Sequence, residues 1–425
     1  MDVAYIMAGI SILIIFSYLF DAFARKTKFP SVILLIATGI GLRWLADVFN
    51  YHIPYLDRII PTFGTIGLIL IVLEGALELE INKQKRSLII RGFMSALVTL
   101  LLTAFGLAIM FHEWMGIPFL EALFDATPLA IISSAVAIPS AAGLLNKDKE
   151  FVVYESTFSD ILGIVLFYFL KPHLVNNTTG LAFEVPKLVT AGSFVSLFFE
   201  IIMVVIISLL VTYVLIELIA RISHKVKFFL ILALLILAYV IAKKFHLSAL
   251  IIIFFFGLFM ANSRNLLPLR WRKFINTSKA EKGLHEFHIL TAESTFLIRT
   301  GFFLFFGFNI TLEMFLSGET YIYGLAILGV ILAVRFMYLG ATQPKNLLPS
   351  AFIAPRGLIT ILLFLDLPIE FSNKIINEKV LLIVILGSMF IMLTGLIITQ
   401  NKNEDGDGKS DNQVNFKTIG DVTEP

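Results

Sequence analysis

The sequence predicts an all-α polytopic membrane protein whose helices form an inverted-topology repeat with two broken helices. Three observations lead to this prediction. The 425 residues are 58% hydrophobic and only 15% charged, whereas globular domains have about 45–50% apolar and about 25% charged residues. The apolar residues gather in runs of about 20, the helix length that crosses a bilayer. Two of these runs contain a proline well inside the predicted helix.

Thirteen apolar runs are predicted to span the membrane. Lys and Arg gather in the cytoplasmic loops of such proteins, so their distribution tests the number of spans and the orientation. With the N-terminus outside the cell, and with Lys and Arg at the span ends counted with the adjoining loops, the inside segments hold 22 of these residues and the outside segments hold 8. We therefore expect a plasma-membrane protein with its N-terminus outside and its C-terminus in the cytoplasm. The predicted spans are residues 3–20, 29–45, 62–79, 92–111, 126–145, 151–171, 190–220, 226–242, 246–262, 288–309, 319–339, 347–366 and 378–399.

The remaining sequence carries few functional signals. Residues 401–425 are polar, which predicts a disordered cytoplasmic tail after a transmembrane domain of residues 1–400. The sequence contains no cysteine, and we find no phosphate-binding loop, metal-ligand cluster or nucleophile motif in it. We therefore expect neither enzymatic activity nor a cofactor nor a nucleic-acid partner, and the lipid bilayer is the predicted environment.

One acidic residue in the sixth span requires an explanation. Asp160 lies in "YESTFSDILGIVLFYFL" and is followed by ten apolar or small residues. A charged side chain at the centre of a bilayer costs about 2.5–3.5 kcal/mol even on lenient scales, so it needs a function or a partner. Ser156 lies four residues earlier, on the same helical face, and the two side chains would form half of an oxygen-lined cation site. The alternative is a structural carboxylate neutralised by an arginine.

The fifth and twelfth spans are predicted to be broken helices. Pro139 lies within the fifth and Pro355 within the twelfth. An interior proline frees a backbone carbonyl, which in lipid is tolerated only beside protein or water. A simple kink is the alternative. Spans seven apart cross in opposite directions, so spans three to six and ten to thirteen would form inverted repeats. Interrupted helices at matching positions indicate a binding site at the midplane, and Asp160 follows the first of them.

Four further sequence elements support a family resemblance. "ESTFSD", residues 155–160, matches a Glu-Ser-x-x-Asn-Asp element, with Ser159 in place of Asn. "LEGALEL", residues 73–79, matches an acidic third-span motif and places its acidic residue at Glu74. Arg335 in "LAVRFMYLG" and the Arg356-Gly357 pair match two arginine positions. Through these elements the chain resembles the monovalent cation:proton antiporter superfamily, in particular its sodium/proton exchanger branch.

The resemblance implies a secondary transporter that exchanges protons for Na⁺, K⁺ or Li⁺. A proton and the cation would compete at Asp160, with Ser156, Ser159 and carbonyls freed around Ala137–Pro139 as further ligands. Asp160 and Ser156 would thus hold the transported metal ion. Because Ser159 does not titrate, we expect electroneutral exchange by alternating access. By analogy, the core would comprise residues 62–171 and 288–399, and a homodimer would form through the scaffold spans of residues 1–45 and 190–262.

The resemblance also suggests supporting roles for the other buried charges. Glu155 and Arg335 are expected to form a buried ion pair between spans six and eleven. Glu74 would complete the site through water or pair with a basic group, and Arg356 would offset the helix dipoles at the break. Arg299 matches no position of the family, and its partner stays open.

One departure from the family pattern leaves two alternatives. Where the family has Thr-Asp-Pro, this chain has Ala137-Ile138-Pro139, and "SSAVAIPSA" partly resembles the other branch of the superfamily. A non-transporting module with a degenerate ion site would explain the missing carboxylate. A carrier of organic anions on the same scaffold would instead use Arg299 or Arg356 for specificity.

Overall fold

The computed structural model describes most of the chain. It is helical throughout the described residues, which contain no β-strand. The described residues are 3–27, 30–49, 56–141, 144–177, 199, 202–203, 205–214, 228–244, 249–262, 277–310, 318–344, 347–367 and 376–410.

In the described part of the chain, twelve of the thirteen predicted spans correspond to a helix or, for spans five and twelve, to a pair of helices, and most of the seventh span lies outside the described residues. Seven helical segments of the described residues are long and apolar enough to cross a membrane, and span seven is represented by the shorter apolar helix Val205–Val214. The labelled elements, which include these segments, are α1 (Val3–Thr27), α2 (Ser31–Val48), α3 (Leu56–Glu78), η1 (Lys83–Lys85), α4 (Arg86–Met115), α5 (Phe119–Ala130), α6 (Ser134–Ser140), α7 (Asn146–Asn177), α9 (Phe228–Lys244), α10 (Ala249–Ala261), α13 (Thr277–Phe308), α14 (Gly318–Thr342), α15 (Leu347–Ser350), α16 (Leu358–Leu365) and α17 (Glu378–Ser410).

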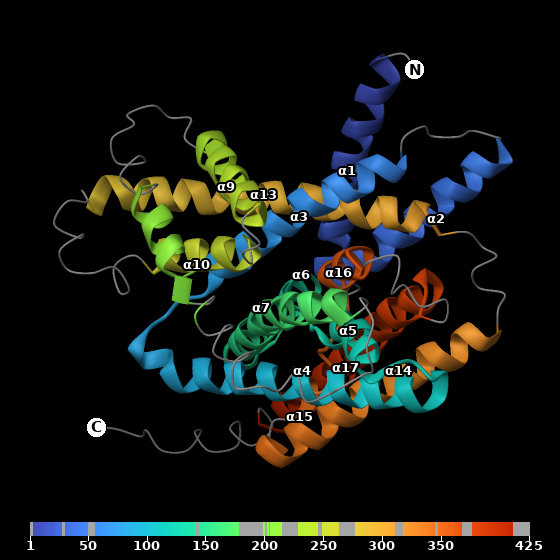
Figure 1. Ribbon diagram of the computed structural model, residues 1–425. Helices are drawn as coiled ribbons and strands as arrows, with labels where there is room; N and C mark the ends of the chain where they lie inside the picture. The colour runs from blue at the N-terminus through green and yellow to red at the C-terminus, as the bar shows by residue number, and fades with distance from the viewer. Residues whose placement is uncertain are drawn as a thin grey trace, which may run out of the picture.

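The helices form two groups that can be followed in Figure 1. In the first group α13 packs against α2 and α3, and α10 packs against α3 and α9. In the second group α4 packs against α5, α7 and α14, and α14 packs against α17. The helices α3 and α13 pack against each other, and α3 also contacts α7 and α16 of the second group. The predicted division into core and scaffold spans stays a prediction.

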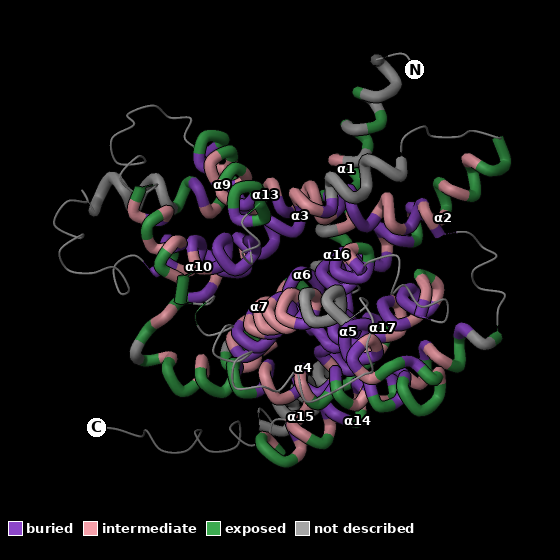
Figure 2. Tube along the Cα trace, viewed as in Figure 1, coloured by how far each residue is buried: buried purple, intermediate pink, exposed green. Residues whose placement is uncertain are grey.

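The two broken helices lie inside the second group. Residues 122–130 of α5 are all buried, and so are residues 358–364 of α16, which Figure 2 shows as purple tubes surrounded by the other helices. A helix that is apolar and buried on every side contacts protein rather than lipid. The breaks between α5 and α6 and between α15 and α16 are thus enclosed by protein.

The end of the chain differs from the prediction. The helix α17 continues to Ser410, ten residues into the polar segment that was expected to be disordered. Extending an existing helix costs little compared with nucleating one, so a transmembrane helix can continue into polar sequence. Residues 411–425, the remainder of the predicted tail, lie outside the described residues.

Candidate functional site at the crossing of the broken helices

The two broken helices meet through their backbones. Residues Ile131 and Ser133 are extended where α5 ends and α6 begins. The amide of Ser133 donates a hydrogen bond of 2.9 Å to the carbonyl of Pro355, in the non-helical stretch before α16. Pro355 therefore lies where the two broken helices meet. Gly357 lies against Ser133, since an added Cβ would be 2.5 Å from the Ser133 hydroxyl oxygen and 2.9 Å from its Cβ.

We predict that Gly357→Ala destabilises the protein. The new methyl group would overlap Ser133 and Val136, so the two crossing segments would have to separate. Overpacking of this kind costs about 1–3 kcal/mol, which thermal unfolding of the purified protein should register as a lower Tm. Gly340→Ala is the control, because nothing lies within 4 Å of a Cβ at this position. An unchanged Tm for Gly357→Ala would contradict the close approach.

The first break lies earlier than the sequence suggested. Pro139 lies within α6, and the carbonyl of Ala137 accepts a bond from Ala141 at the end of that helix. Ala137 is therefore not a source of a freed carbonyl. Proline lacks an N–H, so Pro139 instead frees the carbonyl of Ala135, four residues earlier. Arg299 of α13 donates to this carbonyl at 3.2 Å, which accounts for an arginine that matched no family motif.

Ile138 lies within α6 and outside the crossing. The family comparison placed a missing carboxylate at Ile138, but the crossing is formed by residues 131–133. Ser133 and Val136 both pack against Gly357 of the second broken span. The sequence alone does not indicate at which residue the break starts.

Two buried arginines bind the carbonyl ends of the broken helices. Arg356 donates to the carbonyls of Leu129 at 2.7 Å and Ala130 at 3.3 Å, the last residues of α5. Arg335 donates to the carbonyls of Ser350 and Ile353, at and beyond the end of α15. The C-terminal carbonyls of a helix carry partial negative charge and lack hydrogen-bond donors within the helix. A guanidinium supplies both a positive charge and hydrogen-bond donors. The expected role of Arg356 at the dipole ends fits this geometry.

Glu155 and Arg335 form a buried ion pair. The Arg335 guanidinium contacts the two Glu155 carboxylate oxygens at 2.6 and 3.1 Å. The hydroxyl of Ser95 on α4 donates to Glu155 as well. Both charged side chains are 2% exposed. This network joins α4, α7, α14 and the second broken helix, and it leaves neither charge without a partner.

Asp160 lies at the crossing and is 4% exposed. Its Oδ2 accepts a bond of 3.1 Å from the amide of Ser134, the first residue of α6. Its Oδ1 is buried and has no hydrogen-bond partner among the described residues. The same is true, within the described part of the chain, of the hydroxyl oxygens of Ser133 and Thr157. Thr157 is three residues before Asp160, hence on the same side of α7. Three buried oxygen atoms near the crossing are thus free to bind a cation.

The two predicted serine ligands have other partners. The hydroxyl of Ser156 donates to the carbonyl of Val152 within α7 at 2.7 Å, and its lone pairs remain available. The hydroxyl of Ser159 accepts a bond of 2.9 Å from the amide of Ile132, so it holds the broken segment in place. Thr157 and Ser133 were not singled out from the sequence. The spacing of Thr157 from Asp160 was the signal that could have identified it.

Glu74 lies on α3, which faces the crossing from the first group of helices. Its neighbour Gly75 adjoins both Thr157 and Ser134, with an added Cβ 3.9 Å from either hydroxyl oxygen. Glu74 and Glu78 are one turn apart, and Arg299 is the cation with the largest electrostatic effect on each of them. Arg299 thus acts electrostatically on the carboxylates of α3 while it donates to the freed carbonyl of α6.

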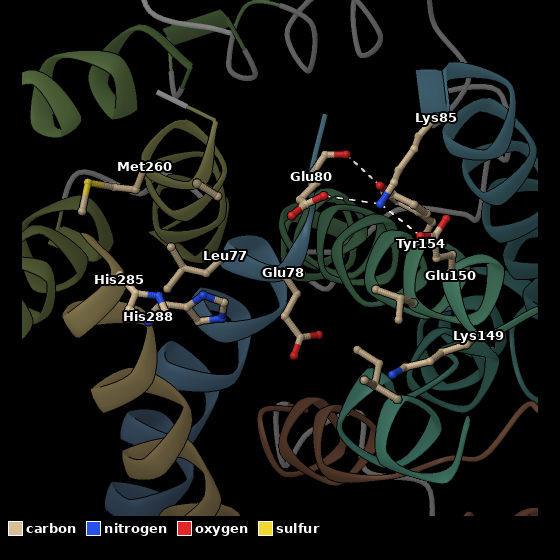
Figure 3. A pocket seen from close by; sticks show the side chains of 13 residues that line it. Leu77, Glu78, Glu80, Lys85, Lys149, Glu150, Tyr154, Met260, His285 and His288 are labelled. Carbon is tan, nitrogen blue, oxygen red and sulfur yellow. Dashed lines mark hydrogen bonds and ion pairs between the residues drawn. The ribbon is translucent and has the colours of Figure 1, made fainter. Parts of the chain in front are cut away.

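A cavity of about 620 Å³ opens on one side of the crossing (Figure 3). Glu78 of α3, Ile138 of α6 and Val153 of α7 line it, together with His285 and His288 of α13. We call the membrane side that holds this cavity the pocket face, and the side where α4 ends and α5 begins the opposite face. The charged and titratable side chains make the lining of the cavity polar, and Asp160 is not among the residues that line it.

An ion-pair cluster lies at the rim of this cavity. Lys85 contacts Glu150 at 3.0 Å and Glu80 at 3.3 Å, and the hydroxyl of Tyr154 donates to the carbonyl of Glu80 at 2.7 Å. The hydrogen bond to Glu150 raises the pKa of Lys85 above its usual value, so this ammonium stays charged at neutral pH. The cluster fixes the segment after α3 against α7.

Comparisons with known proteins identify the family of the chain and support its fold. The family described as "Sodium/hydrogen exchanger, transmembrane" matches residues 10–400. Two similar solved structures are of the sodium proton antiporter MjNhaP1 from Methanocaldococcus jannaschii. The structure at pH 8 is 21% identical, covers 94% of this chain and 99% of its own, and has a TM-score of 0.66. A structure from electron microscopy is 19% identical, covers 100% of both chains and has a TM-score of 0.64. No curated protein matches the sequence. The match over residues 10–400 shows that the chain belongs to the sodium/hydrogen exchanger family.

Proposed function

We propose that the protein exchanges a proton for a monovalent alkali cation by competition at Asp160. The observation that carries this proposal is the unsatisfied Oδ1 of a buried carboxylate at the crossing of two broken helices. A carboxylate in this position can bind either a proton or a monovalent cation. It therefore binds one positive charge in the proton-bound state and one in the cation-bound state. Family membership and the sodium proton antiporter structures support the same reaction class.

The ligands of the cation would be oxygen atoms of α7 and the first break. Asp160 supplies the charge, and the hydroxyls of Thr157 and Ser133 supply neutral oxygens that have no partner in the described structure. Ser156 adds a lone pair, and Glu74 approaches from α3. Hard cations prefer such oxygen ligands. Ser159 positions the break through Ile132 rather than binding the ion directly.

The exchange would proceed by alternating access. The cavity would connect Asp160 with the pocket face, and we infer that this face is cytoplasmic because Lys85 and Lys149, from two of the predicted inside segments, line the cavity. That orientation places the N-terminus outside the cell in the plasma membrane. The broken helices of the second group would move against the first group, through which two copies would form a homodimer.

The alternatives lose support from the geometry. An organic-anion carrier would need a free arginine, yet Arg356 and Arg299 each donate to backbone carbonyls. A degenerate module was suggested by the absence of a carboxylate at Ile138, and this residue lies in α6 beyond the crossing. The carboxylate at the crossing itself is present as Asp160.

Cation-driven proton flux in proteoliposomes tests the proposal. We expect Na⁺, Li⁺ or K⁺ added outside the proteoliposomes to drive protons out of their acidic interior. The cations that cause this proton release define the selectivity. Because one carboxylate exchanges one proton for one charge, clamping the membrane voltage at different values should leave the rate unchanged. The apparent KM for the cation should rise as the pH falls, since protons compete for Asp160. Flux that carries net current would contradict one-for-one exchange, and no flux with any alkali ion would contradict the proposed function.

A further inference from the structure

A second carboxyl group is buried in the core, away from the crossing. Asp125 of α5 is 1% exposed. Both of its carboxylate oxygens are buried, and neither has a hydrogen-bond partner among the described residues. An ionised carboxylate in such a place would be severely destabilising without a partner, so Asp125 carries a proton in this conformation. Burying a neutral carboxyl group without a hydrogen-bond partner also costs free energy. No contact among the described residues offsets this cost.

The position of Asp125 connects it to the opposite face. The helix α5 begins at Phe119 on that face, and Glu121 lies in its first turn. Glu121 is partly exposed and precedes Asp125 by four residues, so the two carboxyl groups lie on one helical side about 6 Å apart along the axis. From Asp125 to the end of α5 at the crossing is a further distance of about 8 Å. The two acids therefore form steps from the opposite face toward Asp160.

Charged groups on the neighbouring helices are engaged elsewhere. On α4, His112 contacts the carbonyl of Ile117 at 2.7 Å and Glu113 is exposed. On α7, Lys171 and Tyr168 both donate to Asp366, which ends α16. Nearer the crossing, Arg356 binds the carbonyls of α5, Asp160 accepts a bond from Ser134, and Glu155 is paired with Arg335. Glu121 is the charged group with a resolved electrostatic effect on Asp125.

A second orphaned oxygen lies in the same half of the core. The hydroxyl oxygen of Thr360 in α16 is buried and has no partner among the residues described. The helix α16 packs against α5. Thr360 lies four residues after Arg356 on the second broken span, and Asp125 lies four residues before Leu129 on α5. Because Arg356 binds the carbonyl of Leu129, the two orphaned groups lie at a similar depth on the side of the opposite face.

We propose that Asp125 is the proton relay between Asp160 and the opposite face. When the opposite face opens, the Asp125 carboxyl group gives its proton to water that enters past Glu121 and then accepts the proton released by Asp160. In the reverse direction, the protonated Asp125 gives its proton to the Asp160 carboxylate and takes up a new one from water at the opposite face. Asp125 passes on the same proton that Asp160 releases, so the one-for-one ratio is unchanged. This inference rests on the proposed function, because it assigns a residue to the exchange reaction.

Transport measured separately from each face tests the relay. In oriented membrane vesicles, wild-type exchange should respond to pH on both faces. We expect Asp125→Asn to lose the response to pH at the opposite face and to keep the response at the pocket face. Asp148→Asn, which changes an acid near the pocket-face end of α7, is the control and should keep both. Wild-type exchange together with an unaltered Asp125→Asn profile would overturn the relay, whereas absence of wild-type exchange would instead overturn the proposed function.

Infrared spectroscopy provides a readout that does not depend on transport. A protonated carboxyl group gives a C=O stretching band that an ionised carboxylate lacks. We expect Asp125→Asn to lose one such band at neutral pH and Asp148→Asn to retain it. Identical spectra for wild type and Asp125→Asn would show that Asp125 is ionised and would overturn the inference. If Asp125→Asn does not fold, Glu121→Gln replaces it in the vesicle assay. Loss of the opposite-face response then supports the route, and full retention overturns it.

Discussion

Asp160→Asn should reduce cation-driven proton flux to the level of empty liposomes while the protein still folds. Asparagine has nearly the same shape, and its side-chain oxygen can still accept the bond from the Ser134 amide. It can neither take up a proton nor neutralise a cation, so both half-reactions of the exchange are lost. Flux with Na⁺, K⁺ and Li⁺ and the Tm should be measured on the same preparation.

The control for this substitution is Asp148→Asn on the same helix. Asp148 lies in the first turn of α7, twelve residues before Asp160, and should leave the flux unchanged. Substantial flux through Asp160→Asn would show that another group carries the proton. Loss of flux together with a much lower Tm would assign Asp160 a structural role, which is the alternative that the sequence left open.

The helical spans and the crossing could be predicted because they follow from local properties of the sequence. Runs of apolar residues predict spans, and the two interior prolines indicated the two interrupted helices. The prediction failed where a partner distant in the sequence decides the structure. Pro139 lies inside α6 because the carbonyl it frees is bound by Arg299, 164 residues away. The break could therefore form earlier, at residues 131–133, where Pro355 and Ser159 satisfy the backbone.

The site shows the same limit. Asp160, Glu155 and Arg335 were identified because ionisable groups are rare in apolar spans and because they match family motifs. Thr157 and Ser133 were missed, since hydroxyl groups are common in membrane helices and only the three-dimensional structure shows which of them lack partners. Asp125 was missed because it lies one residue before the predicted start of its span, where an acid would be solvated. The structure places it inside α5 and buries it.

Removing one partner of the Glu155–Arg335 pair is expected to give the largest loss of stability of any single substitution in the core. Breaking a buried ion pair costs about 3–5 kcal/mol, because the remaining charge is left buried without compensation. Arg335→Met should be worse than Glu155→Gln, since Arg335 also donates to the carbonyls of Ser350 and Ile353. The Tm and the monodisperse fraction after purification should both fall.

The double variant separates the ion pair from the rest of the network. When Glu155→Gln and Arg335→Met are combined, no uncompensated charge remains, so the loss should be smaller than the sum of the two single losses. It should not vanish, because the two carbonyls of the second broken helix still lack their donor. Arg43→Met is the matched control: its partner Asp47 is 55% exposed, and such surface pairs contribute about 0–1 kcal/mol. Strictly additive losses at 155 and 335 would mean that the two side chains stabilise the protein independently, and the arginine would then act chiefly as a cap for the broken helix.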